Sequence, residues 1–278
     1  MRLRPALPLT ALALVACGGG ASHSGSDQGL TATHAAVVTS AVVGSESTAQ
    51  ASSATLPLWA PVGTGDPQSA LGLQMPSMGL PDCATVTTTG PDAQGFTHQT
   101  WTFVHCTSGD ESLDGSIDVV WKAGDYAITF NHLVKSEDGG EETTTLDGTR
   151  HVVIDAASQT GTVTLTNFSL AHTEASEPEE NRTFTYSASY HTDWATAGQF
   201  KLWGTFTAQA NADAAVNGTI DAATPLTWTV GCCRPTSGTL HLDQAGQSAD
   251  VLFSLPCGTV TITVAGQPSV TRRLRGCH

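Results

Sequence analysis

A period-two alternation of apolar and polar residues dominates the chain from about residue 67 onward. It is clearest in GDYAITFNHLVKS (124–136), RTFTYSASYHTDW (182–194) and GQFKLWGTFTAQA (198–210). Successive side chains of a β-strand point to opposite faces, so this alternation predicts half-buried strands. The residues expected on the buried faces are Tyr126, Ile128, Phe130, His132, Val134, Phe184, Tyr186, Ala188, Tyr190, Trp194, Phe200, Leu202, Gly204, Phe206 and Ala208.

Shorter alternating segments extend the pattern over the rest of the chain, and helical periodicity is nearly absent after residue 60. We expect about a dozen strands in all, separated by turns rich in Gly, Pro, Asn and Asp. Long consecutive strands with short connections predict an all-β fold, an antiparallel meander that is curved or partly closed into a barrel. The further strands are expected near 84–89, 97–105, 116–122, 149–155, 226–232, 238–243, 250–256 and 259–264.

One segment changes phase partway along its length. In GTVTLTNFSLAH (161–172), Val163 and Leu165 are odd-numbered, whereas Phe168 and Leu170 are even-numbered. A β-bulge near Thr166-Asn167 would restore a single buried face. A weak echo also relates SLDGSIDVVW (112–121) to TLDGTRHVVI (145–154), and a Gly-Thr pair precedes an apolar residue in LWGTF, VNGTI and TSGTL. We interpret these repeats as hairpin turns that open strands.

The N-terminus has the composition of an export signal. Arg2 and Arg4 precede a mostly apolar run over residues 6–16, which is shorter than the roughly 20 residues of a membrane-spanning helix. The sequence Leu14-Val15-Ala16-Cys17 then resembles the lipobox of bacterial lipoproteins. An ordinary signal peptide that contains a cysteine is the alternative.

This resemblance implies cleavage before Cys17 and acylation of that cysteine. Several acyl chains anchor a protein stably without a spanning helix. Gly18 is not the aspartate that retains lipoproteins in the inner membrane of enteric bacteria. The resemblance therefore favours attachment to the outer membrane of the cell envelope, facing the periplasm or the cell surface.

The expected organisation has three parts. A signal peptide covers 1–16, a Gly/Ser/Ala/Thr-rich tether covers 17–66, and a single β domain covers 67–278. The tether begins with the small polar segment GGGASHSGSDQG and is expected to be disordered, or weakly helical around Ala35 to Val43.

The charge balance excludes two classes of partner. Loss of Arg2 and Arg4 would leave nine Lys and Arg against 25 Asp and Glu, which changes the net charge from −14 to −16. Nucleic acids and anionic membrane surfaces bind clustered positive charge, which only the tail TRRLRGCH offers. We expect no nucleic-acid partner, and contact with the membrane through acyl chains alone.

Six cysteines remain once Cys17 is assigned to lipid. An even number in an exported chain favours disulfides. Cys83 precedes one expected strand and Cys106 ends the next, so an antiparallel hairpin would bring them together. The other four are Cys232, Cys233, Cys257 and Cys277.

The segment CCRPTSGTLHL, followed by LPCGTVTITVAG, resembles a module of secreted bacterial lipoproteins of uncharacterised function. The shared pattern is C-x-x-P-x-S-G, a strand, a return strand, then a cysteine and a last strand that ends in glycine. The resemblance covers residues 232–266. It implies a Cys232–Cys257 disulfide, which leaves Cys233 for Cys277.

Other chemistry has little support. A zinc site would need spaced ligands, and no C-x-x-C occurs. The acidic segments 135–148 and 174–182 could hold calcium but lack the EF-hand order, and solvated hairpin tips are the favoured interpretation. A transmembrane β-barrel is an alternative that the lipobox, the cysteines and the absence of a C-terminal aromatic residue disfavour.

No hydrolase motif is present, and the pair His191 and Asp193 lacks a nucleophile. We therefore expect neither a cofactor nor catalytic residues. Trp203 lies on the polar face of its segment, opposite Phe200 and Leu202, where it would contact a ligand or partner or cover a neighbouring strand. Two functions follow: a non-catalytic, disulfide-stapled β domain with a structural or protein-contact role, or a carrier of an apolar ligand in the curved sheet.

Overall fold

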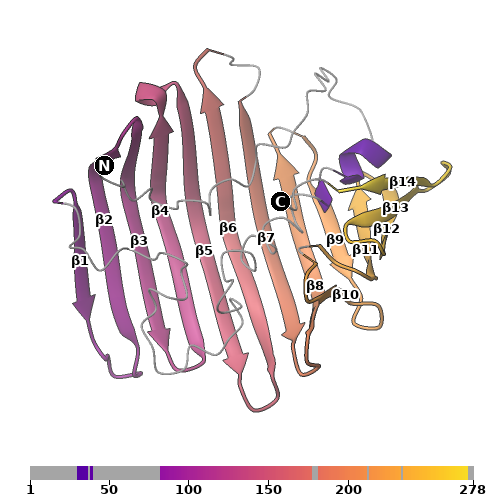
Figure 1. Ribbon diagram of the computed structural model, residues 1–278, viewed down its shortest axis with the longest axis horizontal. Helices are drawn as coiled ribbons and strands as arrows, with labels where there is room; N and C mark the ends of the chain where they lie inside the picture. The colour runs from indigo at the N-terminus through magenta and orange to yellow at the C-terminus, as the bar shows by residue number, and fades with distance from the viewer. Residues whose placement is uncertain are drawn as a thin grey trace, which may run out of the picture.

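The fold is one open antiparallel sheet of fourteen strands, seen in a computed structural model that describes residues 30–36, 38–39, 82–176, 181–211, 213–232 and 234–274 (Figure 1). Neighbours in sequence are neighbours in the sheet from β1 to β9, and β11 to β14 continue the order after β9. β10 also pairs with β8, at residues 199–202, whereas β9 pairs with residues 204–208 of the same strand. The expected all-β meander is confirmed, and the sheet is not closed into a barrel.

The strands differ in length between the two parts of the sheet. β2 to β8 have 12 to 15 residues each, whereas β9 to β14 have four to eight. The bounds are β1 (Ala84–Thr89), β2 (Thr97–Ser108), β3 (Glu111–Lys122), β4 (Asp125–Glu137), β5 (Glu142–Asp155), β6 (Thr160–Glu174), β7 (Arg182–Asp193), β8 (Gln199–Ala210), β9 (Val216–Ile220), β10 (Leu226–Thr229), β11 (Gly238–Gln244), β12 (Gln247–Ser254), β13 (Thr259–Val264) and β14 (Val270–Arg273), with a 3-10 turn η2 (Asp138–Gly140) between β4 and β5.

The alternation produces one buried face, which we call the inner face. Trp101, Val119, Val152, Val163 and Tyr190 lie on it and are at most 2% exposed. The opposite, outer face carries Thr, Ser, His and Asp side chains. Among the elements that the structure describes, β2 to β7 make their extensive contacts only with their neighbours in the sheet.

Three bulges interrupt the long strands at equivalent places. In β2, β4 and β6, two residues oppose one on the next strand, and the second of the two has a positive φ: His105, His132 and Asn167. The bulge expected at Thr166-Asn167 is confirmed. The other two were not expected from the sequence.

The residue opposite each bulge binds its backbone. Asp114 accepts a hydrogen bond from the His105 N–H (2.7 Å), and Asp147 accepts one from the His132 N–H (2.6 Å). At the third bulge, the Ser187 hydroxyl accepts one from Asn167 (3.3 Å). A short side-chain acceptor directly across the strand thus satisfies the donor that the bulge removes from the ladder.

The Leu-Asp-Gly echo belongs to these bulges, and its interpretation as turn punctuation is wrong. Gly115 and Gly148 follow the two aspartates and have φ values of 108° and 113°. A Cβ on Gly148 would lie 2.5 Å from Phe168 Cα, and one on Gly115 would collide with the carbonyl of His132. The aligned bulges therefore form a bulge line across β2 to β7.

The bulge in β4 corrects the face expected for residues 124–136. Tyr126 and Ile128 are buried, but beyond Phe130 the phase changes. Leu133 turns inward and is 4% exposed, while His132 is exposed. The extra residue at the bulge moves each later side chain to the other face.

Two disulfides tie strand ends to their neighbours. Cys83–Cys106 joins the start of β1 to β2 beside its bulge, with a Cα–Cα distance of 5.1 Å. Cys232–Cys257 joins the segment after β10 to the turn before β13, with a Cα–Cα distance of 5.8 Å. These are the pairs that the hairpin and the module resemblance had indicated. Cys17, Cys233 and Cys277 lie outside the described residues.

A short helical segment lies beside β14 (Figure 1). Its first turn begins after Thr31, whose hydroxyl accepts a hydrogen bond from His34 N–H (3.1 Å), as an N-cap does. Leu30, Ala35 and Val38 are buried in the core, and Arg272 donates to Thr33 (3.3 Å).

The expected boundary between tether and domain, at residues 66 and 67, lies outside the described residues. Among the helices described, none has the length and apolar character needed to cross a membrane.

Candidate interaction surface

The bulge line divides the inner face into two halves. The half nearest the β3–β4 and β5–β6 connections is closely packed, with Val163 and Tyr190 both 0% exposed. The other half leads to the β2–β3, β4–β5 and β6–β7 connections, and we call it the acidic end. Its apolar side chains are of two kinds: Leu133, Leu146 and Tyr186 are buried, whereas Leu113, Phe168, Leu170 and Phe184 are only partly buried.

Aromatic contacts organise these side chains. Phe130 and Phe168 meet edge to face across the bulge line, with ring centroids 6.1 Å apart. Phe184 stacks on Tyr186 at 6.0 Å. These contacts hold the three phenylalanine rings in place while part of their surface stays accessible, whereas Tyr186 is buried.

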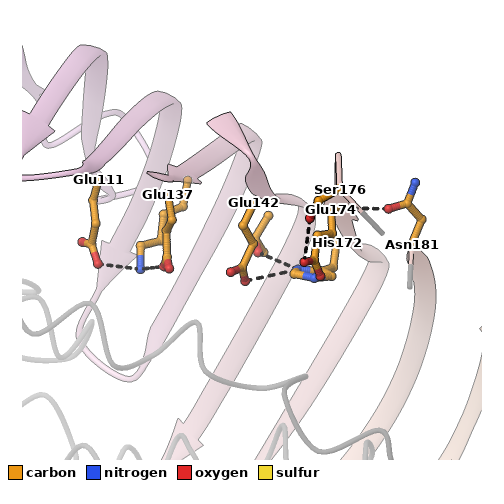
Figure 2. Close-up of polar contacts among 9 residues, drawn as sticks. Glu111, Glu137, Glu142, His172, Glu174, Ser176 and Asn181 are labelled. Atoms are coloured by element: carbon orange, nitrogen blue, oxygen red, sulfur yellow. Dashed lines mark hydrogen bonds and ion pairs between the residues drawn. The ribbon is translucent and has the colours of Figure 1, made fainter. Parts of the chain in front are cut away.

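A row of charged side chains borders this apolar surface on the same face (Figure 2). Lys135 of β4 lies between Glu111 of β3, at 3.2 Å, and Glu137. Partial burial would lower the pKa of Lys135, but hydrogen bonds to Glu137 and Glu111 outweigh it and raise the pKa. The ammonium group therefore stays charged, and its side chain is only 14% exposed.

The row continues over β5 and β6. His172 Nδ1 lies 3.7 Å from a Glu142 carboxylate oxygen and 3.5 Å from the Thr144 hydroxyl. Glu174 accepts a hydrogen bond from the Ser176 hydroxyl, and its backbone N–H donates to Asn181 Oδ1 at 2.7 Å (Figure 2). We call Glu111, Lys135, Glu137, Glu142, His172 and Glu174 the charged row.

Negative charge is in excess at this end. Among the described side chains, seven carboxylates and one lysine (Lys135) occupy it. Such an excess at one end of a sheet attracts cationic groups. The carboxylates are Asp110, Glu111, Glu137, Glu141, Glu142, Glu174 and Asp213.

At the opposite end, the carboxylates have local partners. Asp125 binds His151 (2.7 Å) and lies 4.0 Å from Lys122. Asp193 lies 3.9 Å from Lys201. The two ends therefore differ in the balance of charge as well as in packing.

The structure brings Trp203 and His191 together on the outer face. They pair in register between β8 and β7, and their rings stack with centroids 5.7 Å apart. Asp193, the other residue of the histidine–aspartate pair, contacts Lys201 instead. The stack covers part of the indole, so Trp203 at least serves as cover for a neighbouring strand.

Sequence reasoning missed a shallow depression beside the third bulge. It has a volume of about 330 Å³ and uncharged walls of hydroxyl and amide groups. Its lining includes Asn167, Thr185, Ser187, Thr207 and Gln209. The phase change at Thr166-Asn167 was the only sequence signal for it.

Histidine–carboxylate pairs recur across the sheet and were also missed. Six of the eight histidines in the described parts of the chain lie within 4.0 Å of a carboxylate. A hydrogen bond to Asp250 (2.7 Å) raises the pKa of His241, and a hydrogen bond from His98 lowers the pKa of Asp92. The pairs are His98–Asp92, His105–Asp114, His132–Asp147, His151–Asp125, His172–Glu142 and His241–Asp250.

Within the described ranges, no three His, Cys, Asp or Glu side chains are grouped as metal ligands would be. No protein-family model, no curated protein and no solved structure matches the chain.

Proposed function

We propose that this protein is a lipid-anchored protein of the bacterial cell envelope whose disulfide-stapled β domain makes non-catalytic contacts with other proteins. The observation that carries the proposal is the pair of disulfides, Cys83–Cys106 and Cys232–Cys257. Disulfides persist in oxidising compartments such as the periplasm. The lipobox resemblance at Leu14 to Cys17 supplies the route and the anchor.

The anchor is tested by labelling with radioactive palmitate in a bacterial host. The wild-type chain is expected to incorporate label and to fractionate with the outer membrane. Cys17→Ser should incorporate none and be lost from the membrane fraction, because two or more acyl chains are needed for stable attachment. A Cys277→Ser variant, which keeps the lipobox, is the matched control. An unlabelled wild-type chain would contradict the proposal.

The compartment is tested by a non-reducing peptide map of protein purified from that host. We expect peptides joined through Cys83–Cys106 and Cys232–Cys257, and a third linked pair from Cys233 and Cys277. Free thiols at the first two pairs would contradict export to an oxidising compartment.

A further inference from the structure

We propose that the acidic end of the inner face is the docking surface for a basic, amphipathic segment of a partner protein. This inference rests on the proposed contact role and gives that role a location and a partner chemistry. It concerns the apolar side chains beyond the bulge line together with the charged row.

Part of the apolar surface beyond the bulge line is left accessible by the described strands. Leu165 and Leu170 both lie on β6 and face inward, but Leu165 is buried whereas Leu170 is partly exposed. Phe168 and Phe184 are partly exposed in the same way. Clustered apolar side chains that a domain leaves half covered mark contact surfaces more often than isolated ones do.

The charges select the kind of occupant. Lys135 is already shared between Glu111 and Glu137, so it does not neutralise Glu142 or Glu174. Among the described side chains at this end, seven carboxylates stand against one lysine. A partner with lysines or arginines would gain Coulomb energy, and an anionic lipid surface or nucleic acid would be repelled.

The dimensions suit a helix lying across the strand ends. Four strand spacings separate β3 from β7, which is about 19 Å at about 4.8 Å per spacing. A helix of about 13 residues has that length. Its apolar side would contact Phe168 and Leu170, while its basic side would lie along Glu142 and Glu174, at a level four to six residues farther along β6.

The test uses the purified full chain and a synthetic Lys/Leu amphipathic helix of about 14 residues. A Lys/Ser peptide of equal charge is the control ligand, and binding is measured by calorimetry at about 50 and about 300 mM salt. We expect the Lys/Leu peptide to bind at least about tenfold more tightly than the Lys/Ser peptide, and to weaken with salt.

The contribution of the charged row is tested by a triple variant that combines Glu111→Gln, Glu142→Gln and Glu174→Gln. Its matched control is Asp193→Asn, Asp243→Asn and Asp250→Asn, which removes the same charge elsewhere. The first should weaken binding about tenfold or more and the second less than about threefold. Leu170→Ser should weaken only the Lys/Leu peptide, and melting curves verify that each variant is folded.

Equal losses in the two triple variants would overturn the proposal, because net charge alone would then explain the binding. Equal affinity for the Lys/Leu and Lys/Ser peptides would also overturn the proposal. A third contradicting result is a neutral lipid that stays bound to the protein in native mass spectrometry when the Lys/Leu peptide is added, because a lipid would then occupy this face. Palmitate labelling of Cys17 is independent of these results, so failure of the surface and failure of the lipid anchor are told apart.

Discussion

The two halves of the inner face use the same strands and the same alternation, yet they are built differently. On β6, Val163 and Leu165 lie in a closely packed layer, and after the bulge at Asn167 the same strand presents Phe168 and Leu170 partly exposed and ends at His172 and Glu174. The difference shows that a long strand can hold core residues at one end and partly exposed apolar side chains at the other. The bulge separates the two because it resets which side chains face inward.

The largest effect on stability is expected when Leu165→Ala is compared with Leu170→Ala, both on β6. Leu165 is buried, so truncation should lower the free energy of unfolding by about 3 kcal/mol, as for leucines in packed cores. Leu170→Ala should cost about 1 kcal/mol, because its side chain is already partly hydrated. Urea unfolding measures both, and equal losses would mean that the two halves are packed alike.

The bulge line itself is tested at Gly148. Gly148→Ala should cost about 2 kcal/mol or more, since its φ is 113° and the new Cβ would lie 2.5 Å from Phe168 Cα. Gly139→Ala in η2 is the control: its φ is 71° with open space around the Cβ, and about 1 kcal/mol is expected. Chemical unfolding compares them, and a similar cost for both would remove the close contact as the reason for glycine.

The role of Lys135 in the charged row is tested by Lys135→Met. Removing the ammonium leaves Glu111 and Glu137 facing each other without a cation, so stability should fall by about 1 kcal/mol at low salt and less at high salt. Lys122→Met is the control, because its ammonium group faces one carboxylate, Asp125, at 4.0 Å, and otherwise lies 4.0 Å from the centre of the Phe96 ring, so it does not separate two carboxylates. Thermal melting at two salt concentrations measures the difference; a loss that does not depend on salt would argue against an electrostatic role.

The smallest effect concerns pH and a histidine outside the charged row. The pKa of His241 is raised in the folded state by its hydrogen bond to Asp250, so the stability it adds is fully present below the unfolded pKa of about 6.5. That stability is lost as pH rises through the higher folded pKa. His241→Gln should therefore lower Tm at pH 5.5 more than at pH 8.5, and a uniform shift would exclude the linkage.

Much of the fold follows from the sequence because strand alternation is a local property. β1 and β13 have the bounds expected from alternation alone, and the bulge in β6 was visible as a phase change between Leu165 and Phe168. The bulge in β4 was hidden, because Phe130, His132 and Val134 keep the rhythm if histidine counts as apolar. Only pairing with β5 shows that Leu133 faces inward.

The candidate surface was less accessible to sequence reasoning. Segments 135–148 and 174–182 read as separate acidic hairpin tips, and Glu111 was not singled out. The meander places these segments side by side, and the bulges turn Lys135 and Glu137 to the inner face. The histidine–carboxylate pairs depend on register in the same way, since His151 and Asp125 are 26 residues apart.

By itself, the sequence determined the all-β class, the approximate strand positions, the acidity and the hairpin pairing of Cys83 with Cys106. Tertiary structure alone decided that the bulges align, that the inner face divides at them, and that the carboxylates of four neighbouring strands, β3 to β6, gather at one end. The physical reason is that alternation depends on the backbone of one strand, whereas register depends on hydrogen bonds between strands.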